Sequence, residues 1–219
     1  MHATRFVTLE GVEGAGKSTV AHVLQGALER AGARVLLTRE PGGTPLAEAM
    51  RTLLLRRDSE QISPVAETLM MFAARSVHLD NAVRPALAAG KWVLCDRFTD
   101  ATFAYQGAGR GVEESLIAKL AGAIHPELWP ARTLLLDLPV AEGLERARRR
   151  GAGADRFESE QVAFFERVRA GYLARAAAEP RRIRVIDARA EAQVVGAAAL
   201  AAIDDLLADW QVGGGGQRA

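Results

Sequence analysis

The feature that most constrains the fold is a glycine-rich segment near the N-terminus. Residues 11–18 match the pattern Gly-x-x-x-x-Gly-Lys-Ser in full, after an apolar run at 6–9 and before a helical stretch at 17–31. Glycines let successive backbone N–H groups converge on phosphate oxygens, and the helix N-terminus adds positive potential. The segment therefore predicts a phosphate-binding loop for a nucleoside triphosphate. Its residues are Gly11, Val12, Glu13, Gly14, Ala15, Gly16, Lys17, Ser18 and Thr19.

Two side chains of this phosphate-binding loop have specific expected roles. Lys17 is expected to reach the β- and γ-phosphates, and Ser18 to ligate Mg²⁺ through its hydroxyl. A glycine-rich turn that fits the pattern by chance is the alternative, which the strand-loop-helix context disfavours. The loop does not indicate which reaction follows triphosphate binding.

Short apolar runs alternate with helical stretches along the rest of the chain. Further strands are predicted at 35–37, 92–95, 134–136 and 183–186, and helices at 45–57, 64–89 and 191–210. Buried strands separated by helices indicate a parallel sheet, here of five strands, covered on both faces. Asp96, Asp137 and Asp187 each end a strand, at the edge where ligands of such α/β sheets bind.

We expect a single domain over residues 1–212, because neither a repeat nor a linker divides the chain. The stretch 146–156, rich in arginine and glycine, is expected to be a charged loop. Residues 213–219 begin with four successive glycines and are expected to form a frayed tail.

Composition excludes several classes of protein. Lys and Arg total 28 against 27 Asp and Glu, so the chain lacks the overall basic charge of a nucleic-acid-binding surface. The single cysteine, Cys95, rules out a disulfide framework and a multi-cysteine zinc site. No apolar run approaches the ~20 residues of a membrane helix, and the N-terminus has no secretion signal. We expect a cytoplasmic protein whose partners include neither nucleic acid nor membrane.

Five segments together carry a resemblance to a known family. They read Phe-Val-Thr-Leu-Glu-Gly-Val-Glu-Gly-Ala-Gly-Lys-Ser-Thr at 6–19, Thr-Arg-Glu-Pro-Gly-Gly-Thr at 38–44, Asp-Arg-Phe at 96–98, Ala-Tyr-Gln-Gly at 104–107 and Asp-Arg-Phe-Glu at 155–158. In this order they resemble the bacterial thymidylate kinases. The resemblance implies a P-loop kinase fold, phosphorylation of dTMP to dTDP with ATP and Mg²⁺, and a homodimer.

The resemblance also implies which residues meet the phosphates. Arg97 is similar to the family arginine that binds the dTMP phosphate, and a guanidinium fork suits that ligand. Asp96 resembles the family acid near the metal. Glu13 resembles the acid that contacts the monophosphate near its sugar. A structural Arg97–Asp96 pair and a solvent-exposed Glu13 are the alternatives.

Gly14 departs from one subclass of the family, which carries a catalytic arginine at that position. The other subclass supplies arginines from a lid, which corresponds here to about residues 146–158. Arg149, Arg150 and Arg156 are accordingly expected to neutralise charge on the transferring phosphoryl group. A solvated basic helix end is the alternative for each of them.

A base pocket is implied as well. Arg75 is similar to the family arginine that bonds the base carbonyl, and Thr102 to the small polar residue at the N3/O4 edge. Tyr105 matches the tyrosine packed under the deoxyribose, with Gln106 beside it.

Two neighbouring residues are candidates for stacking on the thymine. Phe72 is expected to stack, although it precedes Arg75 by three residues and the usual spacing is four. Met71 occupies the four-residue spacing, and both positions share one helix face with Arg75. Plain core packing is the alternative for Phe72.

The chemistry implied is an in-line attack of a dTMP phosphate oxygen on the γ-phosphorus of ATP. That oxygen is ionised near pH 7, so no general base is needed, and positioning and charge neutralisation carry the rate. One rival is a kinase for another nucleoside monophosphate or small metabolite. Another is a P-loop ATPase or switch protein, which Leu138 disfavours because it stands after Asp137 where such proteins have an acid.

Overall fold

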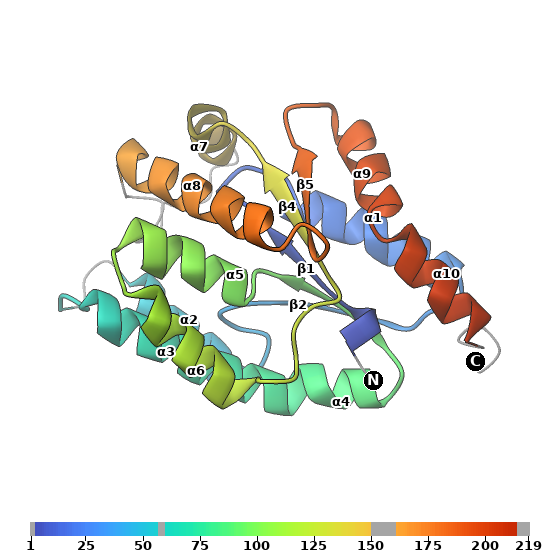
Figure 1. The fold of residues 1–219 in the computed structure, drawn as a ribbon, viewed down its shortest axis with the longest axis horizontal. Helices are drawn as coiled ribbons and strands as arrows, with labels where there is room; N and C mark the ends of the chain where they lie inside the picture. The colour runs from blue at the N-terminus through green and yellow to red at the C-terminus, as the bar shows by residue number, and fades with distance from the viewer. Residues whose placement is uncertain (1–2, 57–59, 150–160, 214–219) are drawn as a thin grey trace.

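The structure, a computed structural model, describes residues 3–56, 60–149 and 161–213. At its centre is a five-stranded sheet in the order β2-β3-β1-β4-β5, with every neighbouring pair parallel (Figure 1). The strands are β1 (Phe6–Glu10), β2 (Val35–Arg39), β3 (Trp92–Asp96), β4 (Arg132–Asp137) and β5 (Ile183–Asp187). The predicted α/β class is confirmed, and each strand extends beyond its predicted run by one to three residues.

Helices alternate with the strands and cover both faces of the sheet (Figure 1). Over the described residues they are η1 (Ala3–Arg5), α1 (Lys17–Arg30), α2 (Pro45–Leu55), α3 (Pro64–His78), the π-helical η2 (Leu79–Val83), α4 (Arg84–Ala88), α5 (Thr99–Thr102), the π-helical η3 (Phe103–Gly109), α6 (Glu114–Ile124), α7 (Val140–Arg149), α8 (Val162–Ala178), α9 (Ala192–Ala201) and α10 (Asp204–Val212).

Alternate residues of β1 face opposite layers of helices. Val7 and Leu9 belong to one cluster of buried apolar side chains together with Leu24 of α1, whereas Phe6 belongs to a second cluster with Leu87 of α4. Burial of each such side chain contributes roughly 2 kcal/mol. Because β1 is buried on both faces, its C-terminal end is a fixed point from which the phosphate-binding loop emerges.

The predicted helix at 64–89 is interrupted. α3 begins after Ser63, whose side chain caps it by accepting from the Ala66 N–H at 3.2 Å, and it passes through η2 into α4. Pro85 has no N–H to donate to the carbonyl of Asn81, and its ring crowds that carbonyl. The wider π-helical turn that precedes α4 accommodates it.

Two further predictions differ from the structure. The predicted helix at 191–210 consists of α9 and α10 with a turn between them, which keeps both Ile203 and Leu206 in the core. Residues 146–149 of the predicted loop belong to α7, where Glu142–Arg146 and Glu145–Arg149 form ion pairs four residues apart. The rest of that predicted loop and residues 214–219 of the predicted tail lie outside the described residues.

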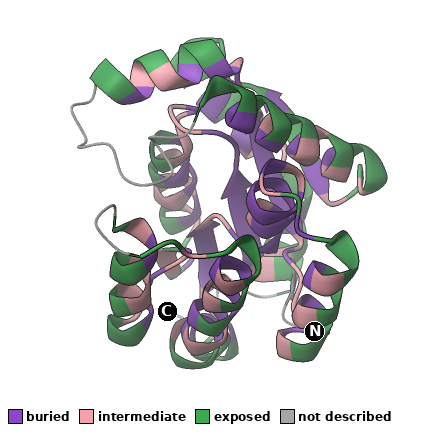
Figure 2. Ribbon diagram, turned by 90° about the vertical axis from the view of Figure 1, so that its left-hand side faces the viewer, coloured by how far each residue is buried: buried purple, intermediate pink, exposed green. Residues whose placement is uncertain are grey.

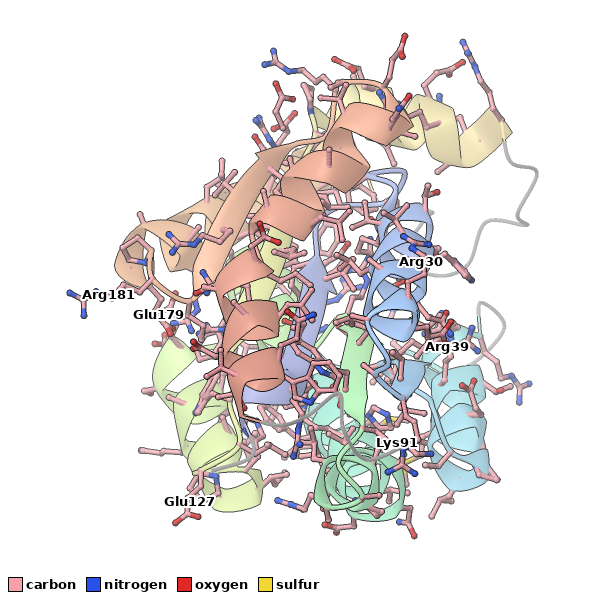
Figure 3. All side chains as sticks on the ribbon, turned by 90° about the vertical axis from the view of Figure 1, so that its right-hand side faces the viewer. Arg30, Arg39, Lys91, Glu127, Glu179 and Arg181 are labelled. Atoms are coloured by element: carbon pink, nitrogen blue, oxygen red, sulfur yellow. The ribbon has the colours of Figure 1, made fainter. Side chains whose placement is uncertain are left out.

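Burial follows the layers of the fold. Buried residues lie along the sheet and the inner faces of the helices, and exposed residues lie on the outer faces (Figure 2). Side chains of both charges project outward from separate elements, among them Arg39, Glu127 and Arg181 (Figure 3). Among the helices described, none combines the length and the apolar character needed to cross a membrane.

Candidate active site

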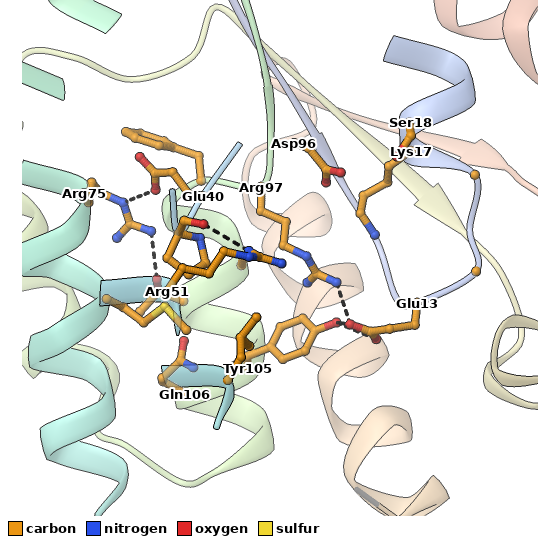
Figure 4. Close-up of a pocket in the computed structure, with 18 residues that line it drawn as sticks. Glu13, Lys17, Ser18, Glu40, Arg51, Arg75, Asp96, Arg97, Tyr105 and Gln106 are labelled. Carbon is orange, nitrogen blue, oxygen red and sulfur yellow. Dashed lines mark hydrogen bonds and ion pairs between the residues drawn. The ribbon is translucent and has the colours of Figure 1, made fainter. Parts of the chain in front are cut away.

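A pocket opens at the C-terminal edge of the sheet, between the phosphate-binding loop, α2, α3 and the segment that follows β3 (Figure 4). It brings together most of the residues predicted to form the site. Its lining contains Glu13, Gly14, Gly16, Lys17, Ser18, Glu40, Pro41, Arg51, Leu55, Met71, Arg75, Asp96, Arg97, Phe98, Ala101, Thr102, Tyr105 and Gln106.

The phosphate-binding loop has the backbone that its glycines predict. Gly11, Gly14 and Gly16 have φ angles of 134°, 77° and 91°, which residues with a side chain rarely adopt. Lys17 Nζ donates to the carbonyl oxygens of Gly11 at 3.0 Å and Val12 at 3.1 Å. Burial and then the nearby Arg97 guanidinium lower the pKa of Lys17. The Lys17 side chain thus lies over the loop, within reach of any anion bound there.

The structure gives a steric reason for Gly14. A Cβ at this position would stand 2.0 Å from the carbonyl oxygen of Gly143 in α7. Since α7 occupies the space beside the loop, an arginine at position 14 cannot be accommodated without moving that helix.

Arg97 lies between the phosphate-binding loop and the rest of the pocket. Its Nη2 donates to Glu13 Oε1 at 2.7 Å, and its guanidinium carbon lies 4.5 Å from the centre of the Tyr105 ring. The Tyr105 hydroxyl also donates to Glu13, at 2.9 and 2.8 Å from its two oxygens (Figure 4). Glu13 is therefore neither solvent-exposed nor directed at the loop alone, because it aligns two side chains of the pocket.

Arg75 is held in place by a buried carboxylate. Its Nε donates to Glu40 Oε2 at 2.7 Å, and its Nη2 donates to Thr102 Oγ1 at 3.1 Å (Figure 4). His78 bonds the other Glu40 oxygen at 2.9 Å. Burial alone would raise the pKa of Glu40, but Arg75 and His78 outweigh burial and lower it. Glu40 therefore stays ionised and fixes the guanidinium.

The bonds to Glu40 and Thr102 leave one nitrogen of Arg75 without a partner in the described part of the chain. Its Nη1 is buried and has no hydrogen-bond partner among residues 3–56, 60–149 and 161–213. Buried donors are rarely left unpaired in folded proteins. Since Arg75 lines the pocket, this nitrogen can donate to an oxygen of a bound molecule.

The structure does not bring Phe72 into the pocket. Phe72 is 1% exposed and packs with Phe103 and Ile117 in the core, and the Arg75 guanidinium lies 4.7 Å from its ring centre. Met71, one position earlier, lines the pocket. Both residues lie near Arg75 on α3. The rotation of that helix directs Met71, four residues before Arg75, toward the cavity, and directs Phe72, three residues before it, into the core. The predicted placement of Phe72 at the pocket is therefore not found, and of the two positions only Met71 lies where it could meet a bound base.

The residues predicted to hold a metal fit that role in chemistry and placement. Ser18 and Asp96 both line the pocket, beside Lys17 (Figure 4). Asp96 Oδ1 is buried and has no hydrogen-bond partner in the described part of the chain. A buried carboxylate oxygen needs such a partner, and a cation or its water would supply one.

The predicted lid arginines are only partly described. Arg149, at the end of α7, donates to Glu145 Oε1 at 2.9 Å, and its side chain is 78% exposed. Arg150 and Arg156 lie outside the described residues. Gln106 is buried and donates to Glu67 Oε1 at 2.9 Å.

Two charged residues of the pocket were not predicted from the sequence. Arg51 of α2 lines it and donates to the Pro41 carbonyl oxygen at 3.0 Å (Figure 4). Glu40 lies inside the segment 38–44 that supported the family resemblance, and that location was the available signal for it. Arg51 carried no such signal, because a lone arginine on an amphipathic helix is most often solvated.

This fold and this site define a class of protein. A phosphate-binding loop faces a second pocket that contains Arg51, Arg75 and Arg97, at the C-terminal edge of a parallel sheet. The arrangement is that of a P-loop kinase with one site for a triphosphate and another for an anionic acceptor.

Comparison with known proteins names the family. The family model for thymidylate kinase matches residues 9–198. The thymidylate kinase of Chromohalobacter salexigens is 53% identical over 207 residues, which cover 94% of this chain and 98% of that one. The thymidylate kinase of Pseudomonas syringae pv. syringae is 57% identical over 183 residues, or 84% of this chain and 87% of that one. The chain belongs to the thymidylate kinase family.

A solved structure agrees with this assignment. The crystal structure of thymidylate kinase from Ehrlichia chaffeensis superposes with a TM-score of 0.76 at 31% identity. The match covers 92% of this chain and 99% of that one. The fold and the sequence therefore indicate the same family independently of the site geometry.

Proposed function

We propose that this protein transfers the γ-phosphoryl group of ATP to dTMP, which yields ADP and dTDP. The observation that carries the proposal is the placement of Arg97. Its guanidinium lies beside the phosphate-binding loop and is aligned by Glu13, in the same pocket as the free Arg75 nitrogen. A monophosphate bound to Arg97 would face the terminal phosphate of a nucleotide held by the loop.

The chain's own groups position the two substrates and neutralise charge. Lys17 would exchange its bonds to the loop carbonyls for bonds to the β- and γ-phosphates of ATP, and Arg97 would hold the dTMP phosphate. Ser18 and Asp96 would hold the Mg²⁺ that accompanies ATP, which neutralises charge on the phosphate oxygens. The attacking phosphate oxygen is already ionised, so the site needs no general base.

The other pocket residues would select thymine and deoxyribose. Arg75 Nη1 would donate to a base carbonyl, and Thr102, which already bonds Arg75, would meet the N3/O4 edge. Tyr105 would pack under the deoxyribose beside Gln106, and Met71 would lie against the base. Cytosine would be rejected because its exocyclic amine presents a donor to the Arg75 donor.

The rival P-loop ATPase is disfavoured by the end of β4. Arg169 donates to the two oxygens of Asp137, from Nε at 2.7 Å and from Nη2 at 2.8 Å. A carboxylate engaged in a bidentate ion pair is not available to orient a hydrolytic water. Arg149, Arg150 and Arg156 are proposed instead to neutralise charge on the transferring group, as expected for a lid-type kinase.

A second copy of this chain is the partner that we propose. Both helices of the substrate-binding side carry apolar side chains that are about half exposed: Leu46 and Leu53 on α2, and Val65 and Leu69 on α3. The two residues of each helix lie on one face of it. α2 and α3 pack side by side. Light scattering should give twice the chain mass of 23.4 kDa, and Leu53→Glu with Leu69→Glu should yield a monomer.

The cytoplasmic location stays a prediction from the sequence.

A coupled assay of ADP formation tests the proposed reaction. dTMP, dUMP, UMP, CMP, AMP and GMP are offered in turn with ATP and Mg²⁺, and ATP alone serves as the blank. dTMP should give the highest kcat/KM, and turnover without an acceptor should be minimal. A folded Lys17→Ala variant should lose at least about a hundredfold in kcat. Acceptor-independent hydrolysis, or a preference for another monophosphate, would contradict the proposal.

A further inference from the structure

The backbone at Arg97 is in an unusual conformation. Its φ is 70°, and in the part of the chain that the structure describes it is the one residue other than glycine with a positive φ. Such left-handed backbone is strained for a residue with a side chain. It occurs directly after β3 ends at Asp96, where the chain turns so that the Arg97 side chain enters the pocket.

Two hydrogen bonds to acceptors on β1 hold this turn. The Arg97 N–H donates to the Leu9 carbonyl oxygen at 2.9 Å, which extends the pairing of Leu9 with Asp96. The next N–H, that of Phe98, donates to a side chain instead, to Glu10 Oε1 at 2.7 Å. Glu10 is the last residue of β1, immediately before the phosphate-binding loop. The sheet ladder alone would not bind the Phe98 N–H at this point.

The second oxygen of Glu10 is also engaged. Its Oε2 accepts from the Tyr172 hydroxyl of α8 at 2.7 Å, and the same hydroxyl accepts from Arg97 Nη1 at 3.5 Å. Glu10 is therefore linked to Arg97 through two intermediates, the backbone N–H of Phe98 and the hydroxyl of Tyr172. Glu13, in contrast, contacts only the tip of the guanidinium, at 2.7 Å.

Burial of the Glu10 carboxyl group at this position costs folding free energy. Glu10 is 0% exposed, and burial, followed by the Asp100 carboxylate, raises the pKa of its carboxyl to about 8. The bonds from Tyr172 and Phe98 and the charge of Arg97 act in the opposite direction. Packing alone does not call for a buried acid, because β1 is otherwise apolar apart from Thr8. The acid is explained by the two donors that it binds.

We propose that Glu10 is a positioning residue for the acceptor nucleotide: it fixes the left-handed turn at Arg97 and so aims the guanidinium at the phosphate of the monophosphate substrate. The inference rests on the proposed function, in which Arg97 binds that phosphate. Because Glu10 ends the strand that carries the phosphate-binding loop, one strand end sets the position of the donor site relative to the acceptor-binding arginine.

The experiment is a double-mutant cycle between Glu10 and Arg97. Glu10→Leu removes the acceptor at similar size, and it should raise KM for dTMP at least about tenfold with a change in KM for ATP below about threefold. Glu10→Gln keeps an oxygen that accepts from the Phe98 N–H, so KM for dTMP should stay within about threefold of the parent. In an Arg97→Ala background, Glu10→Leu should change KM for dTMP by less than about twofold.

A matched control is available on the same strand. Thr8 is 0% exposed, and its hydroxyl bonds Thr133 Oγ1 of β4 at 2.8 Å, whereas the Arg97 turn follows β3 on the other side of β1. Thr8→Val removes a buried hydrogen bond of β1 and should lower the unfolding temperature without changing KM for dTMP. An equal effect of Glu10→Leu with and without Arg97 would overturn the proposal, and so would an unchanged KM for dTMP in folded Glu10→Leu.

If Glu10→Leu does not fold, Tyr172→Phe carries the test. It removes the hydroxyl that joins Glu10 to Arg97 and leaves the Phe98 bond in place. KM for dTMP should rise about three- to tenfold in the parent and not in the Arg97→Ala background. An unchanged KM would refute the role assigned to Glu10. A parent enzyme that does not phosphorylate dTMP would refute the proposed function instead, so the two failures are distinguishable.

Discussion

The backbone of Gly143 in α7 lies so close to the backbone of Glu13 that a Cβ on Gly143 would stand 2.4 Å from the Glu13 carbonyl oxygen. Glu13 belongs to the phosphate-binding loop and aligns Arg97 and Tyr105. α7 thus packs directly against the phosphate-binding loop. A side chain at position 143 would displace either the helix or the loop.

Gly143→Ala should therefore impair catalysis. We expect kcat/KM to fall at least about tenfold, because a displaced loop misplaces the phosphates. Gly122→Ala is the matched control: Gly122 also lies in a helix, and a Cβ there would have open space. That control should keep full activity and gain up to about 1 kcal/mol of stability from helix propensity. Equal activity of the two variants would show that α7 yields without consequence.

The different placement of Met71 and Phe72 gives a second prediction. Met71→Ala removes a lining side chain and should raise the Kd for dTMP about three- to tenfold, with little change in unfolding temperature. Phe72→Ala opens a cavity in the core and should lower the free energy of unfolding by about 3–5 kcal/mol. Calorimetric dTMP titration and urea unfolding of both variants separate the two effects. A larger loss of dTMP affinity in a folded Phe72→Ala would restore Phe72 as the stacking residue.

The parts of the fold that sequence analysis predicted correctly depend on local signals. The phosphate-binding loop has its own glycine and lysine spacing, and each strand is an apolar run bounded by turn residues. Strand ends were misplaced by one or two residues, in β1 and β2 because Glu10 and Arg39 lie within strands although they are charged. Glu10 is tolerated there only through bonds to Phe98 and Tyr172, which are 88 and 162 residues away.

The parts that were missed depend on contacts between distant residues. Glu40 fixes Arg75 from 35 residues away, and no local pattern announces that pair. Met71 and Phe72 lie about 100° apart around α3, on either side of Arg75, so the spacing to Arg75 does not say which of them faces the pocket. The packing of Phe72 with Phe103 in the core depends on residues distant in the sequence. In α7 a local signal did exist: the Glu145–Arg149 spacing of four residues favours a helix over the predicted loop.

Selection of deoxyribose should depend on Tyr105. Its ring is 5% exposed, lies against Arg97 and forms part of the pocket wall. A ring packed under C2′ leaves little room for a hydroxyl, so the ribonucleotide is disfavoured sterically. In Tyr105→Ala, the ratio of kcat/KM for dTMP over ribothymidine monophosphate should fall at least about tenfold. Tyr105→Phe keeps the ring, and it should keep the ratio even where loss of the bond to Glu13 lowers the overall rate.

The lid arginines should act on turnover more than on binding. Arg149→Ala, Arg150→Ala and Arg156→Ala should each lower kcat by a larger factor than they raise KM for dTMP, because their charge is needed when the phosphoryl group transfers. Arg184→Ala is the control. Arg184 lies in β5, and among the described residues its side chain donates only to the Pro180 carbonyl oxygen. A triple lid variant with parental kcat would exclude the arginines from the chemistry.

Stability should fall in acid through His125. Its ring is fully buried, its Nε2 bonds Thr99 Oγ1 at 2.8 Å, and its Nδ1 has no hydrogen-bond partner among the described residues. Burial, and after it the charge of Arg75, lower the pKa of His125 from 6.5 to about 4. The unfolded chain therefore binds a proton below pH 6.5 that the folded protein does not bind until about pH 4.

The sign and size of this effect follow from the two pKa values. The contribution of His125 to stability is complete above pH 6.5 and is lost as pH falls toward 4. Between pH 7 and pH 4.5 the parent should lose roughly 2.5 kcal/mol more than His125→Gln, which keeps a polar group but does not titrate. Urea unfolding at both pH values measures the difference, and the acids common to both proteins cancel. His22→Gln, at an exposed position, should follow the parent; if His125→Gln follows it too, the ring is not the acid-sensitive group.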